Sequence, residues 1–267
     1  MNLPDFTSFY WLIMLMIIFF VVITGRYFLI AGLFYFIFYV WFPEKWKQRK
    51  ISQKEYKKGQ LKKEIKWSMI SAVIFSITGA LTVILWQKGH TKIYTEPDAY
   101  GWWYLPASLI IFMFLQETYY YWIHRWMHIP SVFKLIHKVH HDSMIASPFT
   151  AFSFHPLEAT LQAIFLPALF LILPVHYYVI IVLLIIMSFS SVINHLGIEV
   201  YPQRSQKNFA KWVIGASHHS LHHKQFKHNY GLYFTFWDII NKTESPGFNP
   251  LFKKLTQNKD KITVENF

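Results

Sequence analysis

The alternation of apolar and polar stretches along the chain predicts several long helices. Residues 9–42 are almost continuously apolar, and only Thr24, Gly25 and Arg26 interrupt them. About 20 apolar residues are enough for one helix to cross a bilayer. The stretch therefore predicts either two helices with a tight reversal near Gly25 or one long tilted helix, and we favour the two-helix version.

Further apolar stretches follow at about 67–86 and 102–122. Another covers 157–193 and is broken by Pro167 and Pro174, which favours a re-entrant hairpin or two short spans. Together these stretches predict an all-α integral membrane protein, with four to six transmembrane or re-entrant helices and a helical cap.

Composition and charge strengthen the membrane interpretation. Apolar residues make up 54% of the chain and charged residues only 15%, which is typical of membrane proteins. The net charge of +12 is concentrated beside the apolar stretches, with ten Lys or Arg in residues 44–66. The positive-inside rule places this basic segment in the cytoplasm. No groove-reading motif accompanies the charge, so we expect no nucleic-acid partner.

Three histidine clusters lie in the second half of the chain. Their spacing is i, i+4 in the first and i, i+3, i+4 in the other two, so each cluster can present several imidazoles on one helix face. Chance placement of 14 histidines would give about 0.04 His-x-x-His-His matches. The clusters are His124-x-x-x-His128, His137-x-x-His140-His141 and His219-x-x-His222-His223.

Most solitary histidines are surface or satisfied core residues. Uncompensated imidazoles packed together in apolar surroundings are costly, however, unless a metal or carboxylates hold them. Acidic residues are few near these clusters, so ligation would be dominated by nitrogen, which suits Fe, Zn, Cu and Ni. The clusters therefore predict a metal centre.

Counting spans from the basic segment tests this prediction. If residues 44–66 are cytoplasmic, the next two spans leave and return, which places residues 124–141 in the cytoplasm. The hairpin at 157–193 returns the chain to the same side, so His195 and the last cluster lie there too. All the candidate ligands can then meet in one cap on the cytoplasmic side of the membrane.

At these residues the chain resembles the fatty acid hydroxylase superfamily, which includes sterol desaturases, sphingolipid hydroxylases and alkylglycerol monooxygenase. Supporting matches are His155-Pro156, Asn194-His195 and Asn229-Tyr230-Gly231, and the stretch from Ser147 to Pro156 looks most like the sterol C5-desaturase branch. The resemblance divides the chain into N-terminal membrane helices with a basic loop (1–100), a hydroxylase-like catalytic domain (101–245) and a polar C-terminal tail (246–267).

The resemblance implies a membrane enzyme with two iron ions, although zinc could replace them during purification. Such enzymes use O2 and two external electrons on a lipid C–H bond. The lipid would enter from the bilayer, and a separate cytochrome b5-like or ferredoxin-like protein would supply the electrons. The implied metal ligands are His124, His128, His137, His140, His141, His195, His219, His222 and His223.

Residues outside the three histidine clusters have less definite roles. Carboxylates beside the histidine clusters could orient ligating imidazoles. Glu117 is the preferred candidate because it lies two helical turns before His124. The other such carboxylates are Asp142, Glu158 and Asp238. Whether His155 or His218 binds metal is left open, and Asn194 more simply forms a cap or turn. An aromatic belt at the membrane interface is the simplest role for Tyr119, Tyr120, Tyr121, Trp122 and Trp126.

Two other functions compete with a lipid oxygenase. A histidine-based metal transporter or sensor would need ionisable residues near the middle of spans, whereas these histidines gather at span ends. A zinc hydrolase would need three ligands and an open position, and no His-Glu-x-x-His motif is present. Hydroxylation and desaturation remain alternatives, as do sterols, sphingolipids, fatty acyl chains, ether lipids and carotenoids as substrates.

Overall fold

One continuous helix contains the first apolar stretch. In the computed structural model, which describes residues 4–205 and 209–257, α1 (Phe9–Tyr35) runs directly into the π-helical turn η1 (Phe36–Trp41). The predicted reversal near Gly25 is therefore wrong. The polar interruption is absorbed within the helix, because the Thr24 hydroxyl donates to the backbone oxygen of Phe20 at 2.6 Å.

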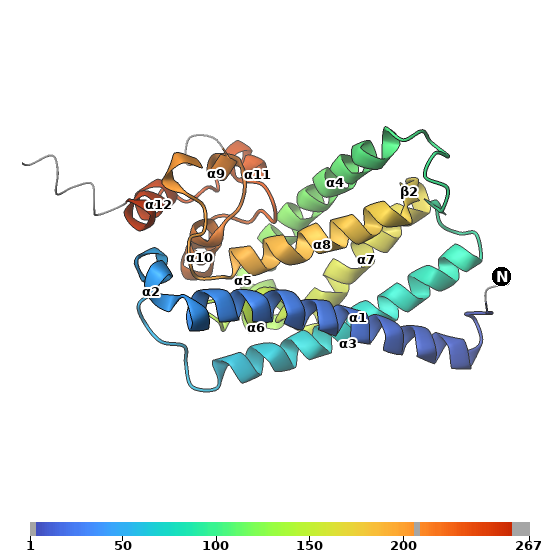
Figure 1. Cartoon of the computed structure of the whole chain (residues 1–267), viewed down its shortest axis with the longest axis horizontal. Coiled ribbons are helices and arrows are strands. Elements are labelled where there is room, and N and C mark those ends of the chain that lie inside the picture. The colour runs from blue at the N-terminus through green and yellow to red at the C-terminus, as the bar shows by residue number, and fades with distance from the viewer. Residues whose placement is uncertain (1–3, 206–208, 258–267) are drawn as a thin grey trace, which may run out of the picture.

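The long helices form two groups that converge at one end (Figure 1). α3 (Gln60–Gln87) packs along α1, where Gly79 allows the ring of Phe19 to approach closely. The second group contains α4 (Tyr104–Met127), α7 (Pro156–Ile172) and α8 (Tyr177–Asn194).

At the far end, a two-residue parallel pairing joins the two groups. β1 (Ile93–Tyr94) follows α3, and β2 (Val175–His176) precedes α8, with Ile93 opposite Val175. The short connections at this end leave the opposite end free for a larger set of loops and short helices.

That opposite end is a cap of short elements, in which the histidine clusters lie. The described elements of the cap are α2 (Pro43–Trp46), η2 (Lys47–Arg49), α5 (Pro130–Val132), η3 (Phe133–His137), α6 (Lys138–His141), η4 (Pro148–Phe152), η5 (Gln203–Ser205), α9 (Phe209–Trp212), α10 (Ala216–Gln225), α11 (Phe236–Ile240) and α12 (Phe248–Thr256). Part of the predicted tail is thus a helix, α12, whose buried Phe248 and Phe252 pack with Leu221 of α10. The tail residues 258–267 lie outside the described residues.

The all-α integral membrane class is confirmed. Among the described residues, three helical stretches are long and apolar enough to cross a membrane: Phe9–Trp41, Gln60–Gln87 and Tyr177–Asn194. The apolar helix Pro156–Ile172 is shorter. The number of passes, and the side on which the cap lies, stay predictions.

A buried carboxylate fixes the loop between α6 and η4. Glu64, near the start of α3, accepts hydrogen bonds from the hydroxyls of Ser143, Ser147 and Thr150. Its exposed fraction is 1%. These bonds tie the segment that follows the second histidine cluster to a long helix, which restricts where that cluster can lie.

Candidate metal centre

Four segments that are distant in sequence bring the histidines together in the cap. α4 ends at the first cluster, η3 and α6 carry the second, and α10 carries the third, while His195 directly follows α8. The second cluster begins in a π-helical turn, a distortion that is frequent at functional sites. The structure thus places all nine predicted ligands in one region.

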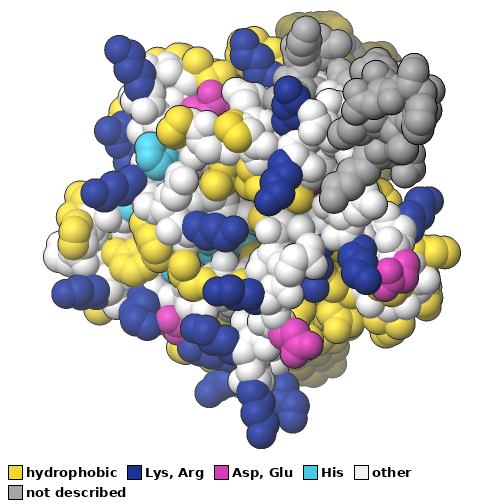
Figure 2. All heavy atoms as spheres, turned by 90° about the vertical axis from the view of Figure 1, so that its left-hand side faces the viewer, with side chains coloured by type: hydrophobic (Ala, Val, Ile, Leu, Met, Phe, Trp, Pro, Cys, Tyr) yellow, Lys and Arg dark blue, Asp and Glu magenta, His cyan; other side chains and the backbone are white. Residues whose placement is uncertain are grey.

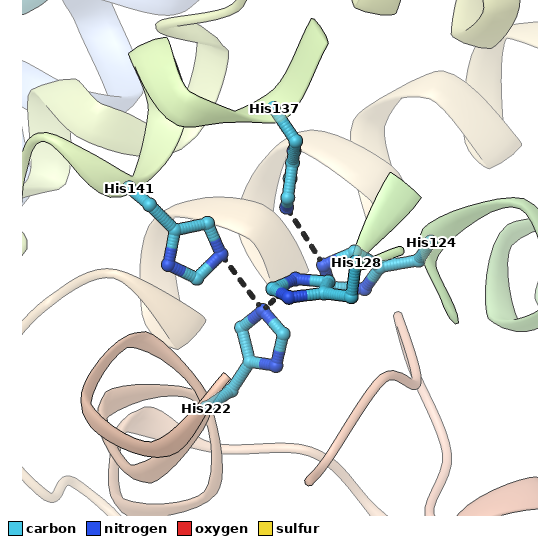
Figure 3. A group of neighbouring side chains, drawn as sticks. All are labelled: His124, His128, His137, His141 and His222. Carbon is cyan, nitrogen blue, oxygen red and sulfur yellow. Dashed lines mark hydrogen bonds between the residues drawn. The ribbon is translucent and has the colours of Figure 1, made fainter. Parts of the chain in front are cut away.

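The nine imidazoles form two groups. The first contains five histidines whose candidate ligand atoms all lie within 4.8 Å of one another, and Figure 3 shows them converging from α4, η3, α6 and α10. The second group meets the same criterion with four. The first group is His124, His128, His137, His141 and His222; the second is His140, His195, His219 and His223.

In both groups the imidazoles approach through their Nε2 atoms. His222 Nε2 lies 3.1 Å from His128 Nε2 and 3.0 Å from His141 Nε2. His219 Nε2 lies 2.9 Å from His195 Nε2 and 3.1 Å from His223 Nε2. Nitrogen ligands at the usual 2.0–2.1 Å from a metal ion are themselves about 3 Å apart, so these separations suit a shared ion.

Hydrogen bonds on the other ring nitrogen determine the tautomer. His124 Nδ1 lies 2.8 Å from the backbone oxygen of Tyr230, and His137 Nδ1 lies 2.9 Å from Glu158 Oε1. A carbonyl oxygen and an ionised carboxylate only accept, so with Glu158 ionised each Nδ1 carries the hydrogen and each neutral ring presents an Nε2 lone pair. Those two Nε2 atoms are nevertheless 3.1 Å apart.

The second group repeats this arrangement. His140 donates from Nδ1 to the backbone oxygen of Ser153, and His195 donates to that of Ser191. Their Nε2 atoms, 3.1 Å apart, again bring two lone pairs together. Facing lone pairs repel unless a cation lies between them, so the donor set fits metal ions in both groups.

The carboxylate that contacts a ligand is not the preferred one. Glu158 accepts from His137, whereas Glu117 accepts from the backbone N–H groups of Leu232, Tyr233 and Phe234. The prediction that Glu117 orients a histidine directly is therefore wrong. Glu117 acts on His124 only indirectly, because it fixes the loop whose Tyr230 carbonyl accepts the hydrogen bond from His124.

The other two carboxylates also have no imidazole partner among the hydrogen bonds of the described residues. Asp238 accepts from the backbone N–H groups of Tyr230 and Gly231, and so orders the same loop as Glu117. Asp142 forms ion pairs with Lys63 and Lys138 at the surface.

The histidines with open roles lie outside both groups. His218 stacks on Phe248, with ring centroids 3.5 Å apart, and His155 accepts from the backbone N–H of Leu157 at the start of α7. Asn194 neither caps nor forms a turn through its side chain. Instead its Nδ2 donates to the backbone oxygen of Leu232, which ties α8 to the loop above it.

The aromatic residues near the end of α4 divide by environment. Trp122 and Trp126 are exposed, as an interfacial belt requires, but Tyr121 is completely buried and donates or accepts a hydrogen bond with Thr243. A belt role for all five aromatic residues is therefore wrong, because the helix turns one face of this segment into the core.

Burial keeps the imidazoles neutral. Loss of solvent, with repulsion from neighbouring imidazoles as a second cause, places the pKa of His140 and His219 well below its usual value. Burial lowers the pKa of His195 to about 4 and that of His218 to about 3. Neutral imidazole is the form that binds metal, so this environment prepares the centre for ligation at neutral pH.

These pKa values predict acid sensitivity. The unfolded chain binds protons near the ordinary histidine pKa of about 6.5, whereas the folded chain does so only near pH 4 or below at His195. The unfolded state thus binds more protons between these values, so stability falls as pH falls. Burial raises the pKa of Glu158, Glu199, Asp238 and Glu244, which acts in the opposite sense, but the histidines whose pKa is lowered outnumber these carboxyl groups.

We therefore expect the unfolding midpoint of metal-stripped protein in detergent to fall progressively between about pH 6.5 and 4.5. The measurement is a thermal melt at several pH values. A midpoint that stays constant or rises over that range would contradict the assignment of neutral buried imidazoles.

An apolar cavity of about 800 Å³ leads to the second group. Residues of α1, α3, α4, α7 and α8 line it, and His195 and His219 form part of its wall. Large side chains such as Phe75, Phe165 and Phe170 dominate the lining. A cavity of this size and character suits a lipid chain or ring system.

Long apolar helices with two buried imidazole groups at one end define the chain as an integral membrane protein whose histidine-rich centre is able to bind metal ions. A family model described as "Fatty acid hydroxylase" matches residues 109–243, half of the sequence and all three histidine clusters. The chain belongs to the fatty acid hydroxylase family.

Its relatives include sterol desaturases. The chain is 33% identical to human lathosterol oxidase over 214 residues, which are 77% of this chain and 70% of the human protein. It is also 33% identical over 187 residues to the Delta(7)-sterol 5(6)-desaturase of Saccharomyces cerevisiae, covering 69% of this chain and 49% of the yeast protein. The predicted resemblance to the sterol C5-desaturase branch is thus confirmed. No solved structure matches the chain.

Proposed function

We propose that the chain is a membrane-bound oxidoreductase that hydroxylates or desaturates a lipid with two iron ions, O2 and two external electrons. The observation that carries this proposal is the pair of imidazole groups with facing Nε2 lone pairs, of which the second lies in the wall of an apolar cavity. One iron ion would be held by each group. Zinc accepts the same nitrogen donors and could occupy them in purified protein.

The chain's own residues would bind, orient and shield the lipid. The apolar walls of the cavity exclude water, and the second group reaches this wall through His195 and His219. The lipid carbon to be oxidised would therefore lie against these two imidazoles. When bound, the iron ions would supply the activation of O2 needed to break an unactivated C–H bond, which no side chain can deprotonate at neutral pH.

A sterol is the first substrate to test, because the relatives are named for lathosterol and Delta(7)-sterols. Hydroxylation would insert one oxygen atom and release one water molecule, whereas desaturation would remove two hydrogen atoms and release two water molecules. Both reactions consume one O2, two electrons and two protons, so both require the same outside donor.

The electrons would come from a separate cytochrome b5-like or ferredoxin-like protein at the cap. Figure 2 views the molecule from the cap end, where exposed Lys and Arg side chains are spread over the surface. This basic face supports a cytoplasmic position beside anionic headgroups and would also suit an acidic donor. Its exposed lysines include Lys45, Lys47, Lys54, Lys57, Lys58, Lys62, Lys63, Lys134, Lys138 and Lys224.

Lipid mass spectrometry tests the proposal. Lipids from cells that express the chain are compared with those from cells that express His222→Ala, and metal is measured in both purified proteins. We expect about two iron ions per wild-type chain and a lipid that gains an oxygen atom or loses two hydrogen atoms. An unchanged lipid profile, together with no bound transition metal after purification that retains it in a related enzyme, would overturn the proposal.

A further inference from the structure

Arg26 places a positive charge about halfway along the first membrane helix. It lies 15 residues before Trp41, so it is roughly 22 Å from that end of the helix. Charged residues at such depth are costly and usually face a cavity or a partner. Arg26 lines the same cavity as Phe19, Val22 and Ile23, the positions that share its helix face.

No carboxylate compensates this charge. Neither Asp nor Glu occurs among the described residues that line the cavity, and Arg26 takes part in none of the ion pairs or hydrogen bonds found there. Its Nε is buried and has no hydrogen-bond partner. Guanidinium stays protonated in proteins and offers five N–H donors. The cavity therefore contains a cation whose donors lack an acceptor.

A series of ring contacts links the helix segment that carries Arg26 to the metal centre. Its neighbour Tyr27 packs edge-on against Phe152, with ring centroids 5.7 Å apart. Two residues further on, Phe154 packs against the ring of His140 at 5.2 Å. Because the cavity wall includes both Arg26 and His195, one lipid molecule can contact both.

We propose that Arg26 is a specificity-determining residue that binds an oxygen acceptor at the polar end of the lipid substrate. A carboxylate or phosphate would satisfy two N–H donors and the charge together, whereas a hydroxyl would satisfy one donor. The identification of this lipid as a substrate rests on the proposed function, but the binding event does not. The polar contact fixes how far the lipid enters and hence which carbon lies beside His195.

Equilibrium binding of matched lipids tests the proposal. Full-length protein, purified with its metal and kept under nitrogen to prevent turnover, is dialysed against radiolabelled octadecanoate, octadecanol, octadecane or lathosterol. Arg26→Met removes the charge and suits a membrane helix, and Arg26→Gln keeps an N–H donor without the charge. Leu29→Met, at an exposed position of the same helix that does not line the cavity, is the matched control.

We expect Arg26→Met to weaken octadecanoate binding about 10- to 100-fold and to leave octadecane binding unchanged, since a hydrogen bond to a charged group is lost. In Arg26→Gln we expect octadecanoate to weaken while octadecanol and lathosterol are retained. If only octadecanol and lathosterol respond to Arg26→Met, the acceptor is a hydroxyl rather than an anion, which still supports an anchor. The control should match the wild type.

Wild-type affinities for all four lipids in both Arg26 variants would overturn the proposal. Because binding is measured without electrons or product, this result is distinct from failure of the proposed function. That failure would appear as absent metal and an unchanged lipid profile, whatever the Arg26 variants bind.

Discussion

Replacement of His222 or His140 by alanine is expected to abolish product formation and to lower the bound metal from about two ions per chain toward one. The two substitutions probe different groups. His222 is central to the first, since its Nε2 lies about equally far from His128 and His141. His140 belongs to the second and contacts His195 through Nε2.

The loss of activity should exceed the roughly 10- to 100-fold change that follows removal of a group that only orients a ligand. Metal content is measured by plasma mass spectrometry and product by lipid mass spectrometry. His90→Ala is the matched control, because His90 is exposed and belongs to neither group. Full metal content and turnover in either His222→Ala or His140→Ala would remove that histidine from the ligand set.

Sequence spacing located eight of the nine histidines and the family resemblance added His195, but neither assigned them to two groups. His140 and His141 are adjacent in sequence, yet they belong to different groups, and their ring centroids are 5.7 Å apart. His222 and His223 separate in the same way. Neighbouring residues on a helix project about 100° apart, so each His-His pair serves two centres. The spacing thus predicts that adjacent histidines diverge. Only the packing of α6 against α10 shows which group each ring belongs to.

The first helix shows how the membrane overrides a local break signal. Gly25 favours a turn in water, but a glycine within a helix costs only about 1 kcal/mol. An open turn at this depth would leave backbone groups without partners, each at a cost of several kcal/mol. The continuous helix α1 is therefore favoured. Arg26 also contributed to the predicted reversal near Gly25. A lone charge in an apolar stretch can instead indicate a functional site.

Helical periodicity placed Glu117 on the helix face of His124 but did not show that the two side chains are too far apart to contact one another. Seven residues separate it from His124, which corresponds to roughly 10.5 Å along the helix axis. A carboxylate cannot span that distance, so Glu117 binds the loop above it. Glu158 comes from another helix, α7, and its contact with His137 depends on tertiary packing that the sequence pattern does not contain.

Replacement of Glu158 by alanine is expected to weaken metal binding by about 10- to 100-fold, the usual effect of removing a carboxylate that orients a ligating imidazole. Glu158 is completely buried and accepts the Nδ1 hydrogen of His137 at 2.9 Å. Without this acceptor, the imidazole would lose both its fixed orientation and the preference for a free Nε2 lone pair. Glu158→Gln should keep most of the affinity, because an amide oxygen also accepts from Nδ1.

Competition with a coloured chelator measures these affinities, with Thr160→Ala as the control. Thr160 lies on the same helix, and its hydroxyl donates only to the backbone oxygen of Pro156. Wild-type affinity in Glu158→Ala would show that the contact with His137 does not tune the centre. If Glu158→Gln binds as weakly as Glu158→Ala, the negative charge rather than the hydrogen bond is responsible.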